Sequence, residues 1–274
     1  MSRANDMAPG AARPKVSVIT VVFNGRDYVE PTLRSVLEQT YPDIEYIVVD
    51  GGSTDGTVDI IRQYEQGISR WSSERDKGIY DAMNKGLATA TGRWVIFMNA
   101  GDAFYAPTTV EEIFGGAVHE ADIVYGGVEI QYPGFSRIQQ PGAPERLWQG
   151  MQFSHQSVFV DVRRHQERPY NAANRIAADL QFFYESLHAG LRFKRLDQVV
   201  ARVSTGGLSE VNRVKAIKAS CDAVCGGRIR PLVRLYYFGR IVDAGLRSLA
   251  KRLLPDSAVV RAIRRKERRQ DRRT

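Results

Sequence analysis

The sequence has little of what marks a secreted or membrane-spanning protein. Its 274 residues include two cysteines, Cys221 and Cys225, which excludes a disulfide framework and favours a reducing compartment. No second cysteine pair or nearby histidine completes a zinc set, so we expect both to be core residues. No stretch offers 18 uncharged apolar residues, so we expect no transmembrane helix. The first residues also lack an apolar run, and we interpret 1–14 as a short disordered leader that is not a secretion signal.

What the sequence does have is an ordinary globular composition with an uneven charge. Hydrophobic residues make up 43% of the chain, enough for a sizeable core, and the formal net charge is +8. Residues 228–274 contain 15 basic and 4 acidic residues (net +11), whereas residues 1–227 contain 24 and 27 (net −3). The basic character therefore belongs to the C-terminal segment, where it suits either nucleic acid or an anionic membrane surface.

Apolar runs alternate with helical periodicities along the first half of the chain. We expect strands at residues 15–23, 44–50, 68–73 and 93–98. We expect a first helix capped by Asp27, with Val29, Leu33, Val36 and Leu37 on one face. Two further helices are expected, one through Ile60, Ile61 and Tyr64 and one over 78–90. This alternation predicts an α/β fold, with a Rossmann-like, mostly parallel central sheet flanked by helices.

The second half is less regular. We expect strands at 122–126, 157–160 and 193–203, a loop at 139–150, a helix at 176–189, a turn at Gly206-Gly207 and basic helical segments beyond it. We find no internal repeat.

Three acidic side chains are expected at the carboxyl edge of the sheet, where ligands bind in open α/β sheets. Asp50 ends IEYIVVD and could accept hydrogen bonds from a base or ribose; a purely structural turn role fits Asp55 better. Asp76 belongs to the charged segment SERDKGIYDAMNKG, in which Asp76, Tyr80 and Asn84 would share one helical face.

The third carboxylate, Asp102, follows the apolar strand in VIFMNAGDAF. An aspartate after a strand commonly caps a helix or closes a turn. However, Gly101 would let a ligand approach the backbone, and Asn99 adds a second oxygen. Oxygen ligands completed by substrate phosphates suit Mg²⁺ or Mn²⁺. Asp102 is thus a candidate metal ligand, with Asn99 as a second.

Together these segments resemble the family 2 glycosyltransferases with the GT-A fold. Within that family they resemble the bacterial polysaccharide (colanic acid-type) enzymes. The match covers roughly residues 16–102: VSVITVVFNG, IEYIVVDGGSTDGT, ERDKGIYDAMNKG and a strand ending in NAGD. The resemblance implies a nucleotide-sugar donor, UDP- or GDP-linked, contacted at its nucleoside by Thr20, Phe23, Asn24 and Asp50 and at its ribose and diphosphate by Asp76 and Lys85. It also implies Mg²⁺ or Mn²⁺ at Asp102. The family's Asp-x-Asp motif lacks its first acid here, where Asn99 stands.

The second half should supply the acceptor site and the base. RIAADLQFF resembles the family's base-bearing segment, and Asp179 is the matching acid; the competing interpretation is a first-turn aspartate favoured by the helix dipole. His155, in FSHQS, could line the acceptor pocket or touch the diphosphate, or be structural. Arg202 starts RVSTGGLS, which resembles a loop over the donor phosphates and could equally be a surface turn.

The basic C-terminus contains an amphipathic helix at 231–255. An apolar stripe recurs every three or four residues: Leu235, Phe238, Val242, Leu246, Leu249 and Leu253. Arg240, Arg247 and Lys251 fall on the other side. Such a helix could lie in a membrane interface or dock on the protein's own core. The basic tail favours the membrane, and no nucleic-acid-binding module accompanies it.

The sequence therefore predicts a GT-A catalytic domain at 15–210, with a nucleotide-sugar half (15–105) and an acceptor half (106–210), followed by a basic helical extension and tail (211–274). The predicted activity is an inverting, metal-dependent transfer of a sugar to a polysaccharide or polyprenyl-linked acceptor. We expect a cytoplasmic protein, peripheral on the inner face of the plasma membrane. Two alternatives remain: a non-catalytic nucleotide-sugar-binding module, and a sugar-phosphate nucleotidyltransferase, which would need a Gly-rich basic phosphate loop after the first strand.

Overall fold

The computed structural model describes residues 13–204, 213–227 and 230–253. The strands are β1 (Val16–Val22), β2 (Ile44–Asp50), β3 (Arg70–Ser73), β4 (Trp94–Phe97), β5 (Ala103–Phe104), β6 (Ile123–Tyr132), β7 (Phe135–Gln139), β8 (Val158–Asp161) and β9 (Phe193–Ser204). The α-helices are α1 (Arg26–Leu37), α2 (Thr57–Gln63), α3 (Ile79–Thr89), α4 (Thr109–Phe114), α5 (Val162–Glu167), α6 (Ala178–His188), α8 (Arg213–Cys225) and α9 (Pro231–Leu253). Three short 3₁₀ helices are η1 (Glu65–Gly67), η2 (Pro144–Gln149) and η3 (His155–Ser157).

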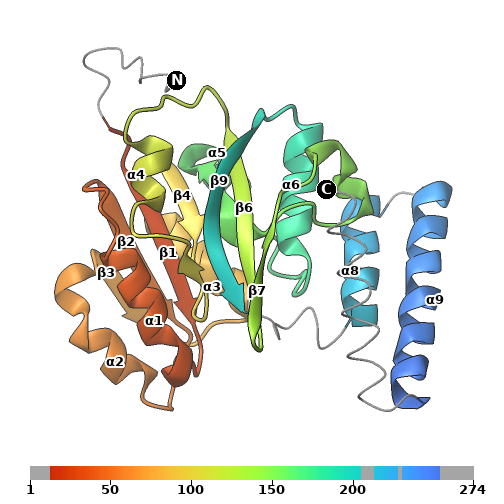
Figure 1. The fold of residues 1–274 in the computed structure, drawn as a ribbon, viewed down its shortest axis with the longest axis horizontal. Coiled ribbons are helices and arrows are strands. Elements are labelled where there is room, and N and C mark those ends of the chain that lie inside the picture. The colour runs from red at the N-terminus through yellow and green to blue at the C-terminus, as the bar shows by residue number, and fades with distance from the viewer. Residues whose placement is uncertain (1–12, 205–212, 228–229, 254–274) are drawn as a thin grey trace.

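One sheet organises the molecule, with strand order β3-β2-β1-β4-β8-β6-β9-β5 and β7 paired to β6 (Figure 1). The first four strands of this order are parallel, whereas β8 runs antiparallel to both of its neighbours. Alternate β1 residues enter two cores: Val18 packs with α1, α2 and α4, and Ile19 packs with α3 and α6. Helices cover both faces, which is why β1 is apolar without a break. The predicted α/β architecture is confirmed.

Local details differ from the sequence-based expectations. Asp27 does not cap α1: Gly25 is the N-cap, and the carboxylate of Asp55 accepts a hydrogen bond from Arg26 N (3.0 Å). Leu37 is 36% exposed and not part of the buried face. The β6–β7 hairpin, β5 and α4 were not predicted, and the loop expected at 139–150 contains η2. These elements are short, and β7 is exposed throughout, so their apolar patterns are weak.

Helices α8 and α9 pack on the side of the molecule formed by α6 and η2, with α8 against α6 and α9 against η2. Figure 1 shows α9 as the outermost element. Burial raises the pKa of Cys221 to about 11, and Cys225 is buried, as expected for core residues. No helix in the described part of the chain is both long and apolar enough to cross a bilayer. The predicted leader (except 13–14), the turn at 206–207 and the tail from 254 lie outside the described residues.

Candidate functional site

The loops that follow β1, β2 and β3 meet at the carboxyl edge of the sheet. Gly51 marks the meeting point, because a Cβ there would collide with the carboxylate of Asp76 and lie 3.3 Å from the Cβ of Phe23. Phe23 is 62% exposed, so its ring is available to a ligand. The structure thus brings together Phe23 and Asp76, two of the predicted donor contacts.

Asp50 holds the loop after β2. Its side chain is fully buried, and its carboxylate accepts hydrogen bonds from Gly52 N (3.0 Å), Ser53 N (2.9 Å), Ser73 Oγ (2.6 Å) and Ser53 Oγ. These donors occupy the carboxylate and fold the loop after β2. The turn interpretation therefore applies to Asp50 as well as to Asp55, and the expected contact between Asp50 and the nucleoside stays a prediction.

Thr20 and Asn24 also make hydrogen bonds within the protein. Thr20 is fully buried inside β1, where its hydroxyl donates to Met98 O (2.7 Å), and its contact with the nucleoside stays a prediction. Asn24 adopts a left-handed conformation (φ 47°) and accepts a hydrogen bond from Thr54 N (3.0 Å). Asn24 joins the loops after β1 and β2.

Asp76 and Lys85 hold the segment before α3. Asp76 accepts a hydrogen bond from Gly78 N (2.8 Å) and precedes the helix, so it does not share the helical face of Tyr80 and Asn84. Lys85 Nζ lies 2.8 Å from Glu74 Oε1, a contact that raises the pKa of Lys85. The expected position of Lys85 near Asp76 is compatible with this placement.

Asp179 occupies the first turn of α6, facing α3. Its Oδ1 accepts hydrogen bonds from Leu180 N (2.8 Å) and from the hydroxyl of Tyr80 (3.1 Å), and its Oδ2 lies 3.5 Å from His155 Nδ1. Burial alone would raise the pKa of Asp179, but His155, Leu180 N and Tyr80 outweigh it and lower the pKa below its ordinary value. Asp179 is therefore ionised at neutral pH, as a general base must be.

Asp102 follows β4 and is held less firmly. Gly101, at φ 96°, turns the chain there, and Gln156 Nε2 donates to Asp102 Oδ2 (3.0 Å). Burial raises the pKa of Asp102 to about 6, although His155 and the Gln156 hydrogen bond oppose this shift. A partly buried carboxylate with one side-chain donor among the described residues is suited to a positively charged ligand.

Two consecutive residues connect these carboxylates. In η3, His155 contacts Asp179 and Gln156 binds Asp102. His155 was expected to line the acceptor pocket, to touch the diphosphate or to be structural, whereas Gln156 was not predicted. The position of Gln156 next to His155, shortly before a buried strand, was the available signal. The candidate base and the candidate metal ligand therefore belong to one site.

Asn99 completes this side of the site. It is 8% exposed, its Nδ2 lies 3.2 Å from His155 Nε2, and its Oδ1 has no hydrogen-bond partner in the described structure. No cluster of three His, Cys, Asp or Glu side chains in the described part could hold a metal. An unpartnered amide oxygen and one carboxylate do fit a hard cation whose other ligands come from a diphosphate.

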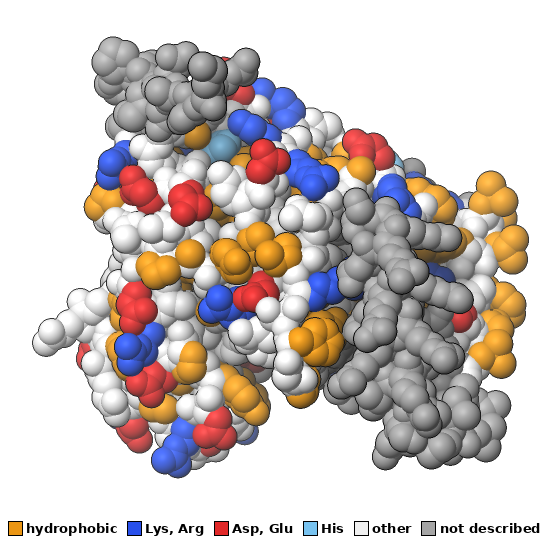
Figure 2. Space-filling view, in the orientation of Figure 1, with side chains coloured by type: hydrophobic (Ala, Val, Ile, Leu, Met, Phe, Trp, Pro, Cys, Tyr) orange, Lys and Arg blue, Asp and Glu red, His pale blue; other side chains and the backbone are white. Residues whose placement is uncertain are grey.

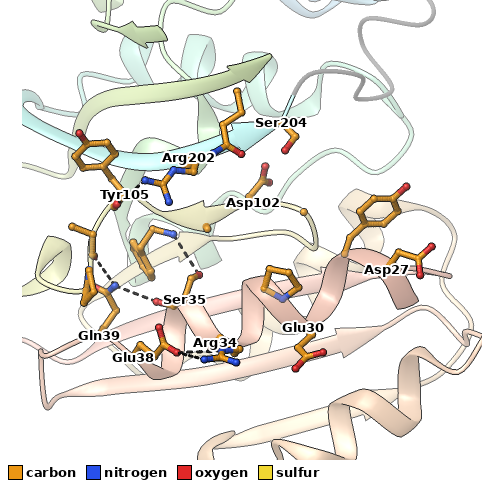
Figure 3. Close-up of a pocket in the computed structure, with 18 residues that line it drawn as sticks. Asp27, Glu30, Arg34, Ser35, Glu38, Gln39, Asp102, Tyr105, Arg202 and Ser204 are labelled. Atoms are coloured by element: carbon orange, nitrogen blue, oxygen red, sulfur yellow. Dashed lines mark hydrogen bonds and ion pairs between the residues drawn. The ribbon is translucent and has the colours of Figure 1, made fainter. Parts of the chain in front are cut away.

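A cavity of about 810 Å³ adjoins Asp102, between α1, the segment after β4 and the end of β9 (Figure 3). Arg202 lines this cavity, where its Nε lies 2.5 Å from Glu129 Oε2 and its guanidinium also reaches Tyr105 O (3.4 Å). Of the predicted site residues, Asp102 and Arg202 line it. Arg202 is thus ion-paired with Glu129 on the wall of the cavity that Asp102 also lines.

Known proteins with similar sequences are glycosyltransferases. A PGL/p-HBAD biosynthesis glycosyltransferase of Mycobacterium tuberculosis is 34% identical over 179 residues, covering 62% of this chain and 69% of the relative. The putative teichuronic acid biosynthesis glycosyltransferase TuaG of Bacillus subtilis is 36% identical over 135 residues, covering 48% and 51%.

Solved glycosyltransferases share the fold. The mannosyltransferase PcManGT from Pyrobaculum calidifontis, in complex with GDP-Man and Mn²⁺, has a TM-score of 0.61 at 19% identity, covering 95% of this chain and 82% of that one. S. aureus TarS has a TM-score of 0.60 at 15% identity; the match covers 83% of this chain and 43% of TarS. The sheet, with helices on both faces, is therefore the GT-A fold. The model for "Glycosyl transferase family 2" matches residues 17–198, so the chain belongs to the family 2 glycosyltransferases and is a glycosyltransferase enzyme.

Proposed function

We propose that the protein is an inverting glycosyltransferase that moves a sugar from a nucleoside-diphosphate donor to an acceptor hydroxyl. The observation that carries this proposal is the single site in which His155 and Gln156 hold Asp179 and Asp102. Asp179, ionised and partly buried, takes the proton of the acceptor hydroxyl as that oxygen attacks the sugar. A single displacement, in which one base deprotonates the attacking hydroxyl, inverts the configuration at the anomeric carbon.

The donor site lies between the exposed ring of Phe23, Asp76 and Asp102 in this proposal. Asp102 and the free Oδ1 of Asn99 would hold Mg²⁺ or Mn²⁺ together with the diphosphate. The cation would neutralise charge on the departing diphosphate. UDP and GDP are the candidate nucleotides, since TarS and PcManGT are described in complex with UDP-GlcNAc and GDP-Man respectively.

The family assignment does not support a nucleotidyltransferase, and no Gly-rich basic loop follows β1. A non-catalytic binding module is the remaining alternative. Thermal shift with UDP or GDP plus Mn²⁺, followed by nucleotide release from matching sugar donors, separates the two. A module would bind nucleotide without turnover.

The base assignment has a direct test. Asp179→Asn keeps the shape of the side chain but removes the base, so we expect kcat for transfer to fall about 10²- to 10⁴-fold with the nucleotide-induced thermal shift unchanged. Asp197→Asn, at an exposed position of β9, is the matched control and should leave both unchanged. A kcat within threefold of wild type for Asp179→Asn would show that the base is elsewhere.

We also propose that α9 places the enzyme on an anionic lipid surface on the cytoplasmic side, where a polyprenyl-linked or polysaccharide acceptor would be presented. The helix has two apolar faces. One face, with Tyr237 and Ala244 buried, packs on the protein, and Arg240 donates to Gln149 O (2.8 Å). The predicted stripe is a different face, and its described members point outward: Leu235, Phe238, Val242 and Leu246, joined by Leu232, are 43–82% exposed.

Figure 2 shows apolar side chains in a column along the outer edge of α9. Self-docking and membrane docking are therefore compatible, because each uses its own face. An anionic bilayer is the occupant to which we commit, since residues 228–274 carry a net charge of +11. Each buried Leu or Phe would contribute about 1.5–3 kcal/mol, and each nearby basic residue about 1 kcal/mol.

Vesicle flotation tests this surface. The double substitution Leu235→Gln and Phe238→Gln should abolish flotation with phosphatidylglycerol vesicles, and Phe135→Gln, an exposed aromatic on β7, should not. Wild-type protein should not float with phosphatidylcholine alone or in high salt. Flotation of the double variant at the wild-type level would contradict the proposal. So would a change from dimer to monomer without loss of flotation, which would identify the stripe as an interface between copies.

A further inference from the structure

A chain of polar contacts runs from the end of β4 to the start of α6. Asn99 Nδ2 lies 3.2 Å from His155 Nε2, and His155 Nδ1 lies 3.5 Å from Asp179 Oδ2. Asn99 is buried, and the side chains of His155 and Asp179 are 19% and 15% exposed. Water reaches these groups poorly, so each depends on the next for its hydrogen bond.

The proton positions along this chain follow from what each group can donate. A carboxylate only accepts hydrogen bonds, so the imidazole nitrogen that faces Asp179 must carry the hydrogen. In the neutral ring the other nitrogen, Nε2, then presents a lone pair and requires a donor. The amide of Asn99 provides one, with its Nδ2 toward His155 and its Oδ1 left free. A carboxylate in place of Asn99 would face that lone pair with another acceptor.

We infer that Asn99 and His155 are positioning residues for Asp179: the amide of Asn99 holds the imidazole of His155 in the tautomer that directs Nδ1–H at the base. This inference rests on the proposed role of Asp179. It explains why an amide stands where the sequence pattern suggests an acid. The two ends of Asn99 have separate tasks, since the nitrogen orients His155 and the oxygen remains available to a cation.

The role of this chain is orientation. Tyr80 and Leu180 N hold one oxygen of Asp179, Oδ1, and His155 faces the other, Oδ2. A contact of 3.5 Å is long for a hydrogen bond, and contacts of this kind tighten when substrate binds. Without His155, Asp179 would lose the restraint on Oδ2 and the largest of the contacts that lower its pKa. We therefore expect an effect on kcat and little effect on donor KM, because the chain does not include Phe23 or Asp76.

The tautomer can be measured directly by ¹⁵N NMR on the metal-free full chain, which has four histidines. We expect wild-type His155 to carry its hydrogen on Nδ1, and Asn99→Asp to add a proton on Nε2. The remaining imidazoles, His119, His165 and His188, should not change. A wild-type His155 protonated at Nε2 alone would overturn the inference, whatever the enzyme's activity.

The second test is kinetic and compares two substitutions of His155 whose amide side chains differ in length. In His155→Asn the amide nitrogen falls close to the place of Nδ1, and in His155→Gln close to that of Nε2. We expect kcat to fall about 10- to 100-fold in His155→Gln and clearly less in His155→Asn, with donor KM within twofold for both. In the Asp179→Asn background neither should cause further loss. Equal losses, or additive losses, would overturn the positioning role. If Asp179→Asn itself keeps full activity, the proposed base fails, and the NMR result remains independent of that failure.

Discussion

Asp50 and Asp102 follow parallel strands of the same sheet, yet their surroundings differ in one decisive respect. Asp50 accepts hydrogen bonds from four donors in its own loop and in Ser73. Asp102 receives one side-chain hydrogen bond, from Gln156, and burial raises its pKa to about 6. Both are preceded by buried strands and lie next to glycine. The same sequence pattern therefore produces a carboxylate that builds a loop with four donors and a carboxylate held by one side-chain donor among the described residues.

Removing the carboxylate of Asp50 and removing that of Asp102 should have opposite effects on the free energy of unfolding. The loop after β2 depends on the oxygens of Asp50, so removing them leaves buried donors without an acceptor. The segment after β4 tolerates Asp102 at a cost, which a bound cation would offset. A site that binds a cation needs such an unsatisfied carboxylate, and the rest of the fold provides the stability.

The largest effect should come from Asp50→Ala. It leaves four donors without an acceptor, and we expect the free energy of unfolding to fall by about 3–5 kcal/mol, measured by urea denaturation. Asp59→Ala, which removes an exposed ion pair with Arg62 on α2, is the control and should cost no more than about 0.5 kcal/mol. A loss below about 1 kcal/mol for Asp50→Ala would mean that water replaces the carboxylate and that Asp50 is available to a ligand.

The next effect has the opposite sign. Asp102→Asn removes a charge that burial disfavours and keeps an oxygen for Gln156. Metal-free protein at pH 7.5 should gain about 1–3 kcal/mol of stability, reduced from the full shift because the side chain is partly accessible to solvent. The same substitution should abolish stabilisation by Mn²⁺ and metal-dependent turnover. If Asp102→Asn has unchanged stability and normal turnover, Asp102 is not a metal ligand.

Much of the nucleotide half was predictable from the sequence. Strands such as β1 and β2 are covered on both faces, so their apolar runs are continuous, and β2 was placed to the residue. The hairpin of β6 and β7 has one exposed strand and little apolar signal. The outward face of α9 was predicted as a stripe, but its second, docked face was not, because aromatic residues such as Tyr237 break the simple amphipathic pattern.

The site was predicted less completely than the fold. Motifs identified Asp102, Asp179 and His155 as candidates, but they do not report how many donors surround a carboxylate. That number depends on loops that meet only in the folded chain, such as Ser73 with Asp50 or Gln156 with Asp102. The motif also does not report that the hydroxyl of Thr20 is hydrogen-bonded within the sheet itself.

The smallest effect is a pH dependence of the difference between wild type and Asp102→Asn. The folded pKa of Asp102, about 6, lies above its ordinary value of 3.8, so the folded state binds more protons between these values. Wild-type stability attributable to Asp102 is therefore present below about pH 4 and is lost as pH rises through about 6, with a slope of at most about 1.4 kcal/mol per pH unit.

The difference between the two proteins reports Asp102 together with its charge interaction with His155. Burial lowers the pKa of His165 to about 4, which makes both proteins less stable in acid, and this common contribution cancels on subtraction. Denaturation between pH 4 and 8 without metal should give a stability difference that grows up to about pH 6 and is then constant. A difference independent of pH would mean that Asp102 titrates as an exposed carboxylate, so that its partner in the folded protein is water and the contrast with Asp50 is one of solvent access.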